Sequence, residues 1–379
     1  MVADSELQRI ARLTPLADVL ASFDIGVGPV APRGETVAAA LGKTLAADVV
    51  APSNHPETAL ALRDGFALRA EATTDATAYA PAPLSPAPLS PAPQRIETGQ
   101  PLPADADAVA AFDSIAMQGA RAQALAAVAP GEGILPPGGD VAAGVVLKTT
   151  GARLRRIDAA VLLALGIERV TIREPRVRVV PLHATRIVRA AASLVANAID
   201  AEGGLAILGK AFGPDPLESV LRAENADAVI AIGGTGSGRN DESVRTLARA
   251  GKVAYHGIGI APGETTAFGY VGARPVLLLP GRLDAALAGW LTVGRRMLAR
   301  LAFRLSEEQP FNAELSRKVA SPLGLAEVVP VRRRGFKIEP LASHYLPLQT
   351  LARADGWILV PAESEGYQAG TSVPVRPWP

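Results

Sequence analysis

The most concentrated chemical signal in the chain is a glycine-rich segment at residues 233–238, which reads GGTGSG. A backbone with so many glycines can adopt positive φ angles and point several N–H groups at one ligand. Groups of backbone N–H donors bind anions such as phosphate. The segment therefore predicts an anion site, and a tight turn that binds nothing is the alternative.

The flanking residues place this segment between a strand and a helix. Residues 228–232 form a wholly apolar run, as in a strand buried in a parallel sheet. Val244 and Leu247 then recur at helical spacing, and Asp241 and Glu242 are expected in the first turn, where acidic side chains suit the helix dipole. No Walker-type Lys-Ser/Thr follows, and the spacing differs from a dinucleotide fingerprint. The sequence thus predicts an anionic ligand without specifying a nucleotide.

The composition limits the class of protein. With 379 residues, 49% hydrophobic and 20% charged, the chain is expected to be globular with two to four domains. A formal net charge of +1 argues against a general nucleic-acid binder. The absence of cysteine excludes disulfides and thiolate sites and favours a cytoplasmic protein. No signal peptide or membrane-spanning run is apparent, so no membrane partner is expected.

Four histidines lack metal-ligand spacing and are predicted to be surface or core residues: His55, His183, His256 and His344.

The region that must position the glycine segment is residues 175–304. Apolar strand patterns alternate there with amphipathic helices, which predicts a three-layer α/β domain with a parallel sheet. Thr185 is predicted to cap the first helix. In such sheets ligands bind at the carboxyl ends of the strands. The loops that qualify follow Leu182 or occupy residues 233–241 and 280–282.

The remaining segments predict three further domains. Residues 1–44 and 149–174 are expected to form a discontinuous N-terminal helical or linker domain, with one of its helices at residues 36–41. Residues 45–148 alternate short β-like runs with turn residues, as in an inserted β-rich domain. Residues 305–379 contain several short strand patterns and predict a small C-terminal β-barrel-like domain.

Several motifs, taken in order, resemble the molybdopterin molybdenumtransferases, the family that inserts molybdenum into the adenylylated pterin and includes the E domain of gephyrin. The matching stretches are LGKTLAADVVAP at 41–52, DGFA at 64–67, TGQPLP at 98–103 with ADAV at 106–109, PGGD at 137–140, the glycine segment, PG at 262–263, LPG at 279–281 and LQTLARADGWILVP at 348–361. The resemblance covers nearly the whole chain.

The resemblance implies an elongated multidomain subunit, normally a homodimer, whose active site is shared between the α/β domain and the partner's C-terminal β domain. It implies molybdopterin or its adenylate as ligand, molybdate as the source of metal, and Mg²⁺. The implied catalytic residues are Asp64, Asp140 and Asp241, with Asp64 and Asp241 as the metal ligands. The implied pterin- and phosphate-binding residues are Thr98, Gly233, Gly234, Gly236, Ser237, Gly238, Pro262, Gly263, Pro280, Gly281 and Arg282.

Structural roles compete with these functional ones. Asp241 sits where a helix cap would also place an acid. The Asp-Gly pair at 64–65 is common in turns, and the Thr-Gly pair at 98–99 is common at strand ends. The joint match of the motifs is what favours a functional role.

The chain departs from the family pattern at charged positions. The acidic turn expected at residues 181–185 reads Pro-Leu-His-Ala-Thr, and Arg239 and Glu264 reverse the charges that the family has there. One hypothesis is a divergent insertase in which Arg63, Arg239 and Arg282 hold phosphate in place of the metal. The alternative is a non-catalytic paralogue that acts as carrier, scaffold or partner of a molybdoenzyme or of another cofactor-synthesis protein. A third is a different phosphorylated or carboxylated ligand.

Overall fold

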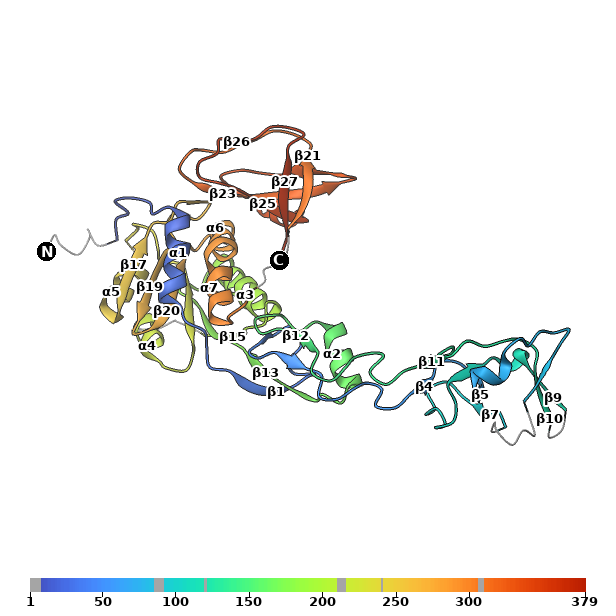
Figure 1. The fold of residues 1–379 in the computed structure, drawn as a ribbon. Coiled ribbons are helices and arrows are strands. Elements are labelled where there is room, and N and C mark those ends of the chain that lie inside the picture. The colour runs from blue at the N-terminus through green and yellow to red at the C-terminus, as the bar shows by residue number, and fades with distance from the viewer. Residues whose placement is uncertain (1–7, 85–91, 119–120, 210–215, 240, 306–309) are drawn as a thin grey trace. The chain divides into compact units, whose positions relative to one another are not determined.

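The computed structural model of the chain describes residues 8–84, 92–118, 121–209, 216–239, 241–305 and 310–379. It divides into two compact units, one of Met1–Ala47 with Thr150–Pro379 and one of Asp48–Thr149 (Figure 1). Each unit has hydrophobic clusters of its own. The finer domain boundaries expected from the sequence stay predictions.

A six-stranded sheet forms the centre of the larger unit, in the order β15-β14-β16-β20-β19-β17. Its strands are β14 (Arg176–Pro181), β15 (Leu205–Leu208), β16 (Ala228–Ile232), β17 (Lys252–His256), β19 (Ala267–Val271) and β20 (Arg274–Leu279). The first four in spatial order are parallel, whereas β19 runs antiparallel to both of its neighbours, β20 and β17. The prediction of a wholly parallel sheet is wrong at this edge. Only a tight turn around Gly272, at φ +61°, joins β19 to β20, and a connection that short allows only antiparallel pairing.

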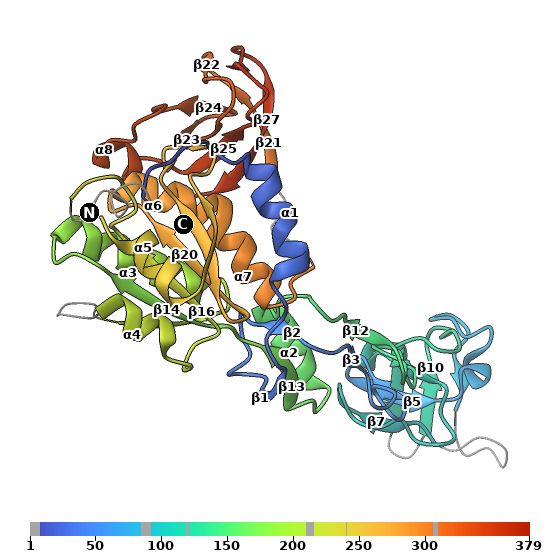
Figure 2. The same ribbon diagram turned by 90° about the vertical axis from the view of Figure 1, so that its left-hand side faces the viewer.

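Helices cover both faces of this sheet (Figure 2). On β16, Ile230 and Ile232 face the layer that contains α3 and α6, whereas Val229 and Ala231 face α4 and α5. This alternation is the period of two that a strand requires, and all of β16 is buried. The predicted three-layer α/β domain is therefore confirmed. The helices are α3 (Arg186–Ala201), α4 (Pro216–Arg222), α5 (Ser243–Ala250) and α6 (Leu283–Gly289), which continues through a π-helical turn (Trp290–Gly294) into α7 (Arg295–Leu301).

The N-terminal residues combine helix and strand. Helix α1 (Leu16–Gly26) packs on the central sheet through Phe23, whose ring centroid lies 4.6 Å from that of Phe268. The predicted helix at residues 36–41 is wrong, because turns follow β1 there and Gly42 has φ +76°. The strands on either side of this segment, β1 and β2, both pair with β13, and the segment turns to connect them. The other elements are β1 (Arg33–Thr36), β2 (Thr44–Leu45), β13 (Arg169–Arg173) and α2 (Arg156–Ala164).

The C-terminal residues form a closed five-stranded barrel, as predicted. Its strands follow the order β23-β24-β21-β27-β25, and β25 pairs back onto β23. Strand β18 (Ile260–Ala261), which comes from the α/β part, extends the sheet beside β23. The remaining elements are β21 (Phe311–Leu315), β22 (Val319–Ala320), β23 (Ala326–Arg334), β24 (Lys337–Pro340), α8 (Leu348–Leu351), β25 (Gly356–Val360), β26 (Gly366–Tyr367) and β27 (Ser372–Pro377).

The smaller unit is β-rich, as predicted. A sheet in the order β7-β5-β8 lies beside another in the order β6-β10-β9 within the unit. Its strands are β3 (Val49–Val50), β4 (Leu60–Ala61), β5 (Gly65–Leu68), β6 (Ala82–Pro83), β7 (Gln94–Ile96), β8 (Ala108–Ala110), β9 (Ile115–Gln118), β10 (Arg121–Ala124), β11 (Ile134–Leu135) and β12 (Val146–Lys148). Across the described residues of both units, no helix has the length and apolar character needed to span a membrane.

Candidate functional site

Residues 233–241, which we call the glycine loop, leave the carboxyl end of β16 and lead to α5. Gly233 has φ +107° and Gly234 has φ +69°, a region of backbone conformation that favours glycine. A Cβ atom on Gly233 would also lie 2.9 Å from Cδ2 of His183. Both the backbone angle and the close approach of His183 therefore require glycine at this position.

Asp241 closes the glycine loop with its own carboxylate. Oδ2 of Asp241 accepts a hydrogen bond from the backbone N–H of Gly238 at 2.8 Å. A Cβ atom on Gly236 or Gly238 would lie 2.8 or 2.9 Å from that oxygen. Helix α5 begins at Ser243 with Glu242 as its N-cap, so the two acids precede the first helical turn instead of lying in it. Asp241 and Glu242 thus lie outside the helix in which the sequence predicted them, and Asp241 bonds the loop backbone through Gly238.

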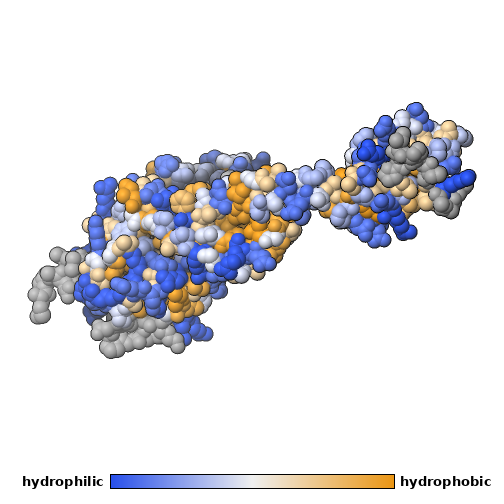
Figure 3. Space-filling view, turned by 60° about the horizontal axis from the view of Figure 1, so that its bottom comes forward, coloured by the Kyte–Doolittle hydropathy of each residue, from blue (hydrophilic) through white to orange (hydrophobic). Residues whose placement is uncertain are grey.

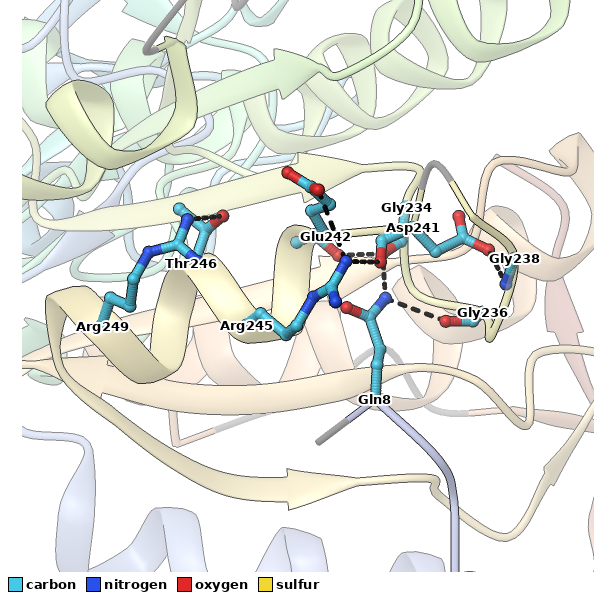
Figure 4. Close-up of polar contacts among 10 residues, drawn as sticks. Gln8, Gly234, Gly236, Gly238, Asp241, Glu242, Arg245, Thr246 and Arg249 are labelled. Atoms are coloured by element: carbon cyan, nitrogen blue, oxygen red, sulfur yellow. Dashed lines mark hydrogen bonds and ion pairs between the residues drawn. The ribbon is translucent and has the colours of Figure 1, made fainter. Parts of the chain in front are cut away.

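Three side chains hold the carbonyl groups of the loop, and one of them, Gln8, comes from the N-terminal segment (Figure 4). Nε2 of Gln8 donates to the carbonyl oxygens of Gly234 and Gly236, at 2.7 and 2.8 Å. The Ser243 hydroxyl also donates to Gly234, at 2.6 Å. Nε2 of His256 lies 3.0 Å from the Thr235 carbonyl oxygen, which only accepts, so this nitrogen carries the proton. Sequence analysis missed Gln8 altogether and gave His256 no role at the loop, since neither lies near it in sequence.

The backbone N–H groups in the middle of the loop differ from those at its ends. At its ends, the N–H of Gly233 donates to the Leu279 carbonyl at 2.8 Å, and that of Gly238 donates to Asp241. Within the described part of the chain, the intervening N–H groups donate to no acceptor; they belong to Gly234, Thr235, Gly236 and Ser237. Of the backbone N–H donors predicted at residues 233–238, those of residues 234–237 are thus the ones without an acceptor in the described part of the chain.

The predicted turns at 262–263 and 280–281 lie beside the loop. A Cβ atom on Gly281, which follows Pro280, would be 3.5 Å from Cα of Gly233. The Thr235 hydroxyl lies 2.9 Å from that of Thr265, in the segment that follows Pro262 and Gly263. Gly263 has φ +123°, and its N–H donates to Oε2 of Glu264 at 3.1 Å. The structure therefore brings these predicted residues together around the glycine loop.

Arg282 is occupied by an ion pair at the boundary with the barrel. Its guanidinium bonds both carboxylate oxygens of Asp284, at 3.1 and 2.5 Å, and lies over the Tyr345 ring at 4.9 Å from the centroid. The hydrogen bonds to Asp284 raise the pKa of Arg282. Asp284 is only 3% exposed and also accepts from the N–H of Leu346 at 3.2 Å. Arg282 therefore supports the packing of the barrel on the α/β domain.

The two other arginines expected to hold an anion differ from each other. Arg63 donates to the Val109 carbonyl at 2.8 Å and to Glu132 at 2.7 Å. Arg239, in the glycine loop, is exposed and has no partner among the described residues. Of the three arginines, Arg239 is the one whose charge is not already paired in the described part of the chain.

The predicted residues Asp64, Thr98 and Asp140 belong to the smaller unit. Oδ1 of Asp64 accepts from the backbone N–H of Thr98 at 2.7 Å and from its hydroxyl at 2.9 Å. These two hydrogen bonds, with a weaker contribution from Arg95, lower the pKa of Asp64. Asp140 is exposed, with its carboxylate 3.8 Å from Nε2 of His55. Asp64 and Thr98 therefore form a contact pair, which Asp140 does not join.

The carboxylates do not assemble a metal site by themselves. In the described ranges, no three or more His, Asp or Glu side chains come together as ligands. One oxygen of Asp241 is taken by Gly238, and Oδ1 of Asp64 is taken by Thr98. Because Mg²⁺ favours six oxygen ligands, these donors do not fit it without a ligand's phosphate and water. We derive no chemical step through a metal.

Comparison with known proteins agrees with this architecture. Residues 5–166 match the MoeA N-terminal region (domain I and II), residues 213–300 match a probable molybdopterin binding domain, and residues 312–378 match the MoeA C-terminal region (domain IV). The chain belongs to the MoeA, or molybdopterin molybdenumtransferase, family. The glycine loop and α5 lie inside the segment that matches the probable molybdopterin binding domain.

Individual relatives of this MoeA-family chain match over most of their length. Molybdopterin molybdenumtransferase 2 of Mycobacterium tuberculosis is 29% identical over 385 residues, covering 89% of this chain and 92% of the relative. Molybdopterin molybdenumtransferase of Haemophilus influenzae is 23% identical, with the same coverage. A crystal structure of a molybdopterin biosynthesis MoeA protein from Pyrococcus horikoshii matches with a TM-score of 0.77 and 26% identity, covering 97% of this chain and 100% of that one.

Proposed function

We propose that this protein binds molybdopterin or its adenylate at the glycine loop and acts in molybdenum cofactor biosynthesis. The observation that carries the proposal is the row of unpaired N–H groups at residues 234–237, at the carboxyl ends of parallel strands. Such donors suit a phosphate group, which molybdopterin and its adenylate both contain. The names of the relatives support the same ligand.

In this proposal each part of the loop has a task. The N–H groups of residues 234–237 hold the phosphate, and Arg239 adds an unpaired positive charge beside them. Asp241 keeps the loop closed through Gly238. Asp64, Asp140 and Thr98, which belong to the smaller unit, stay proposed as catalytic and ligand-binding residues. The finer proposal is that molybdate then supplies molybdenum to the bound pterin.

The alternative is a non-catalytic paralogue, and two observations favour it. The carboxylates proposed for chemistry are engaged in hydrogen bonds within the chain, Asp64 with Thr98 and Asp241 with Gly238. Arg282 is likewise paired with Asp284. In this alternative the protein keeps the ligand site and delivers the cofactor to a molybdoenzyme or a cofactor-synthesis partner.

We further propose a cytoplasmic homodimer. Helix α2 exposes Ile157 and Val161, at 62% and 44% of their full accessibility, one helical turn apart. Hydrophobic residues also gather on the visible surface of the larger unit (Figure 3). Burial of such side chains against a second copy would stabilise a dimer. Sedimentation at micromolar concentration tests this, and a purely monomeric protein would contradict it.

A titration with adenylated molybdopterin tests the binding proposal. We expect saturable binding that persists in EDTA, because the phosphate donors are backbone N–H groups and Arg239. Arg239→Glu should weaken binding by roughly tenfold, since it replaces an attractive charge by a repulsive one. Arg121→Glu, at an exposed position of β10, serves as the control and should bind as the parent protein does. Absence of binding by the parent protein would refute the proposal.

Complementation separates the insertase from its alternative. The gene would be introduced into a strain that lacks its molybdenum insertase, and a molybdoenzyme activity would be measured at ordinary molybdate. Rescue would support metal insertion by this chain. A folded, ligand-binding protein that fails to rescue would favour the carrier or scaffold.

A further inference from the structure

Gln8 reaches the glycine loop from the N-terminal segment, 226 residues away in sequence. Its residue is only 4% exposed, and its Nε2 atom donates to two loop carbonyls, those of Gly234 and Gly236 (Figure 4). Both acceptors are carbonyl oxygens, so the amide nitrogen, with its two N–H bonds, must face them. A single side chain therefore fixes two peptide groups of the loop.

The geometry of the peptide bond links the Gln8 contact to the direction of the loop N–H groups. In a trans peptide the carbonyl of one residue and the N–H of the next point in opposite directions. Because Gln8 holds the carbonyls of Gly234 and Gly236, the N–H groups of Thr235 and Ser237 point away from Gln8. His256 holds the intervening carbonyl, that of Thr235.

We propose that Gln8 is a positioning residue of the ligand site, which orients the glycine-loop peptides so that their N–H groups face the phosphate. This inference rests on the proposed function. Without these hydrogen bonds the Gly236 carbonyl loses its side-chain donor and its peptide can rotate, since glycine tolerates both signs of φ. The Gly234 carbonyl keeps the donors of Ser243. Rotation would turn a carbonyl oxygen toward the ligand, and its partial negative charge would repel the phosphate.

The amide of Gln8 has one unsatisfied atom and one that is fully used. Oε1 of Gln8 is buried and has no hydrogen-bond partner among the described residues. An apolar side chain of the same shape would avoid the cost of that oxygen, but it would leave the Gly236 carbonyl without its side-chain donor. The two donated hydrogen bonds are the feature that only the amide supplies.

Isosteric variants test the inference through affinity for adenylated molybdopterin. Gln8→Met keeps the length of the side chain and removes both N–H donors, so we expect roughly tenfold weaker binding together with a lower thermal midpoint, because the loop carbonyls lose a buried donor. Gln123→Met, at a half-buried position of β10 in the smaller unit, is the matched control and should bind normally.

The affinity of Gln8→Glu for adenylated molybdopterin, measured as a function of pH, distinguishes a positioning role from a merely structural one. A merely structural role would leave this affinity, relative to the parent protein, independent of pH. The ionised carboxylate cannot donate, whereas the protonated acid regains one O–H donor. We therefore expect affinity relative to the parent protein to rise several-fold as the pH falls from 8 to 5.5, because burial raises the pKa of the introduced carboxyl. The other ionisable groups at the loop are the same in the variant and the parent protein; they are His256, Asp241, Glu242 and Arg245. The affinity of Gln8→Glu is therefore divided by that of the parent protein at the same pH.

The outcomes separate the inference from the function on which it rests. If the parent protein binds and Gln8→Met binds equally well, or the Gln8→Glu ratio stays flat with pH, the inference is overturned while the proposed function stands. If the parent protein does not bind, both fail together. Weakened binding by Gln8→Met with a pH-dependent recovery in Gln8→Glu would establish the role.

Discussion

Asp64 is an exposed carboxylate whose pKa is lowered mainly by one neighbour, Thr98. The backbone N–H and the hydroxyl of Thr98 both donate to Oδ1, and they lower the pKa of Asp64 from its ordinary value of 3.8. A lowered pKa in the folded state means that the ionised form favours folding. This contribution is complete above the unfolded pKa near 3.8 and is lost as the pH falls through the folded pKa.

Thr98→Val should raise the pKa of Asp64 part of the way back to 3.8, because it removes the hydroxyl donor and keeps the backbone N–H. Carboxyl-carbon NMR during an acid titration would measure the shift. Thr74→Val, whose hydroxyl donates to the Glu71 carbonyl, is the control and should leave Asp64 unchanged. An unchanged pKa in Thr98→Val would show that the backbone bond alone sets the charge.

Gly236 shows how the size of one residue controls the loop. A Cβ atom there would lie 2.8 Å from Oδ2 of Asp241, which must then leave the N–H of Gly238. We expect Gly236→Ala to weaken binding of adenylated molybdopterin by roughly tenfold and to change stability by less than about 1 kcal/mol, since Gly236 is only half-buried and the three residues after it are exposed. Gly28→Ala, with no atom within 4 Å of the added methyl group, should be neutral in both assays. Normal binding by Gly236→Ala would mean that closure by Asp241 does not matter.

At the scale of elements, α1 is held to the central sheet by aromatic packing. Phe23 is fully buried and contacts Phe268, which in turn packs edge-on against Tyr270 at 5.1 Å between ring centroids. Phe23→Ala should lower the free energy of unfolding by about 3–5 kcal/mol, because it removes a large apolar side chain and leaves a cavity. Urea unfolding followed by circular dichroism would measure it.

Ile25, on the same helix, provides the control. It is 94% exposed, so Ile25→Ala should change the free energy of unfolding by no more than about 0.5 kcal/mol. Equal effects of the Phe23 and Ile25 substitutions would mean that α1 unfolds independently of the sheet.

At the scale of the whole larger unit, Asp284 joins the α/β domain to the barrel. Its buried carboxylate bonds Arg282 in the loop before α6 and the N–H of Leu346 from the barrel. Asp284→Asn should destabilise the protein by about 1–3 kcal/mol, because it removes a charged acceptor from a buried network. Amide hydrogen exchange should also become faster at residues 343–346.

The matched control is an ion pair at the barrel surface. Glu339 bonds Arg334 at 3.1 Å with both side chains partly exposed. Glu339→Gln should therefore cost no more than about 0.5 kcal/mol. If Asp284→Asn behaves like this control, the contact with Leu346 does not hold the barrel in place.

The sequence by itself determined the architecture wherever periodicity is strong. The apolar run at 228–232 became the buried β16, Thr185 accepts a hydrogen bond as the cap of α3, and the strand patterns after residue 305 became the barrel. These features depend on local burial and backbone preference, which neighbouring residues encode. The predicted helix at residues 36–41 failed because its neighbours on both sides are paired in a sheet, which local preference does not reveal.

Only the tertiary structure decided which groups of the site are free and which are already engaged. The resemblance of the motifs to a known family placed Arg282 and Asp241 at the site, but the fold pairs the former with Asp284 and ties the latter to Gly238. It also brings Gln8 onto the glycine loop from 226 residues away. Hydrogen-bond partners of this kind are set by three-dimensional proximity, and no pattern within a short stretch of sequence records them.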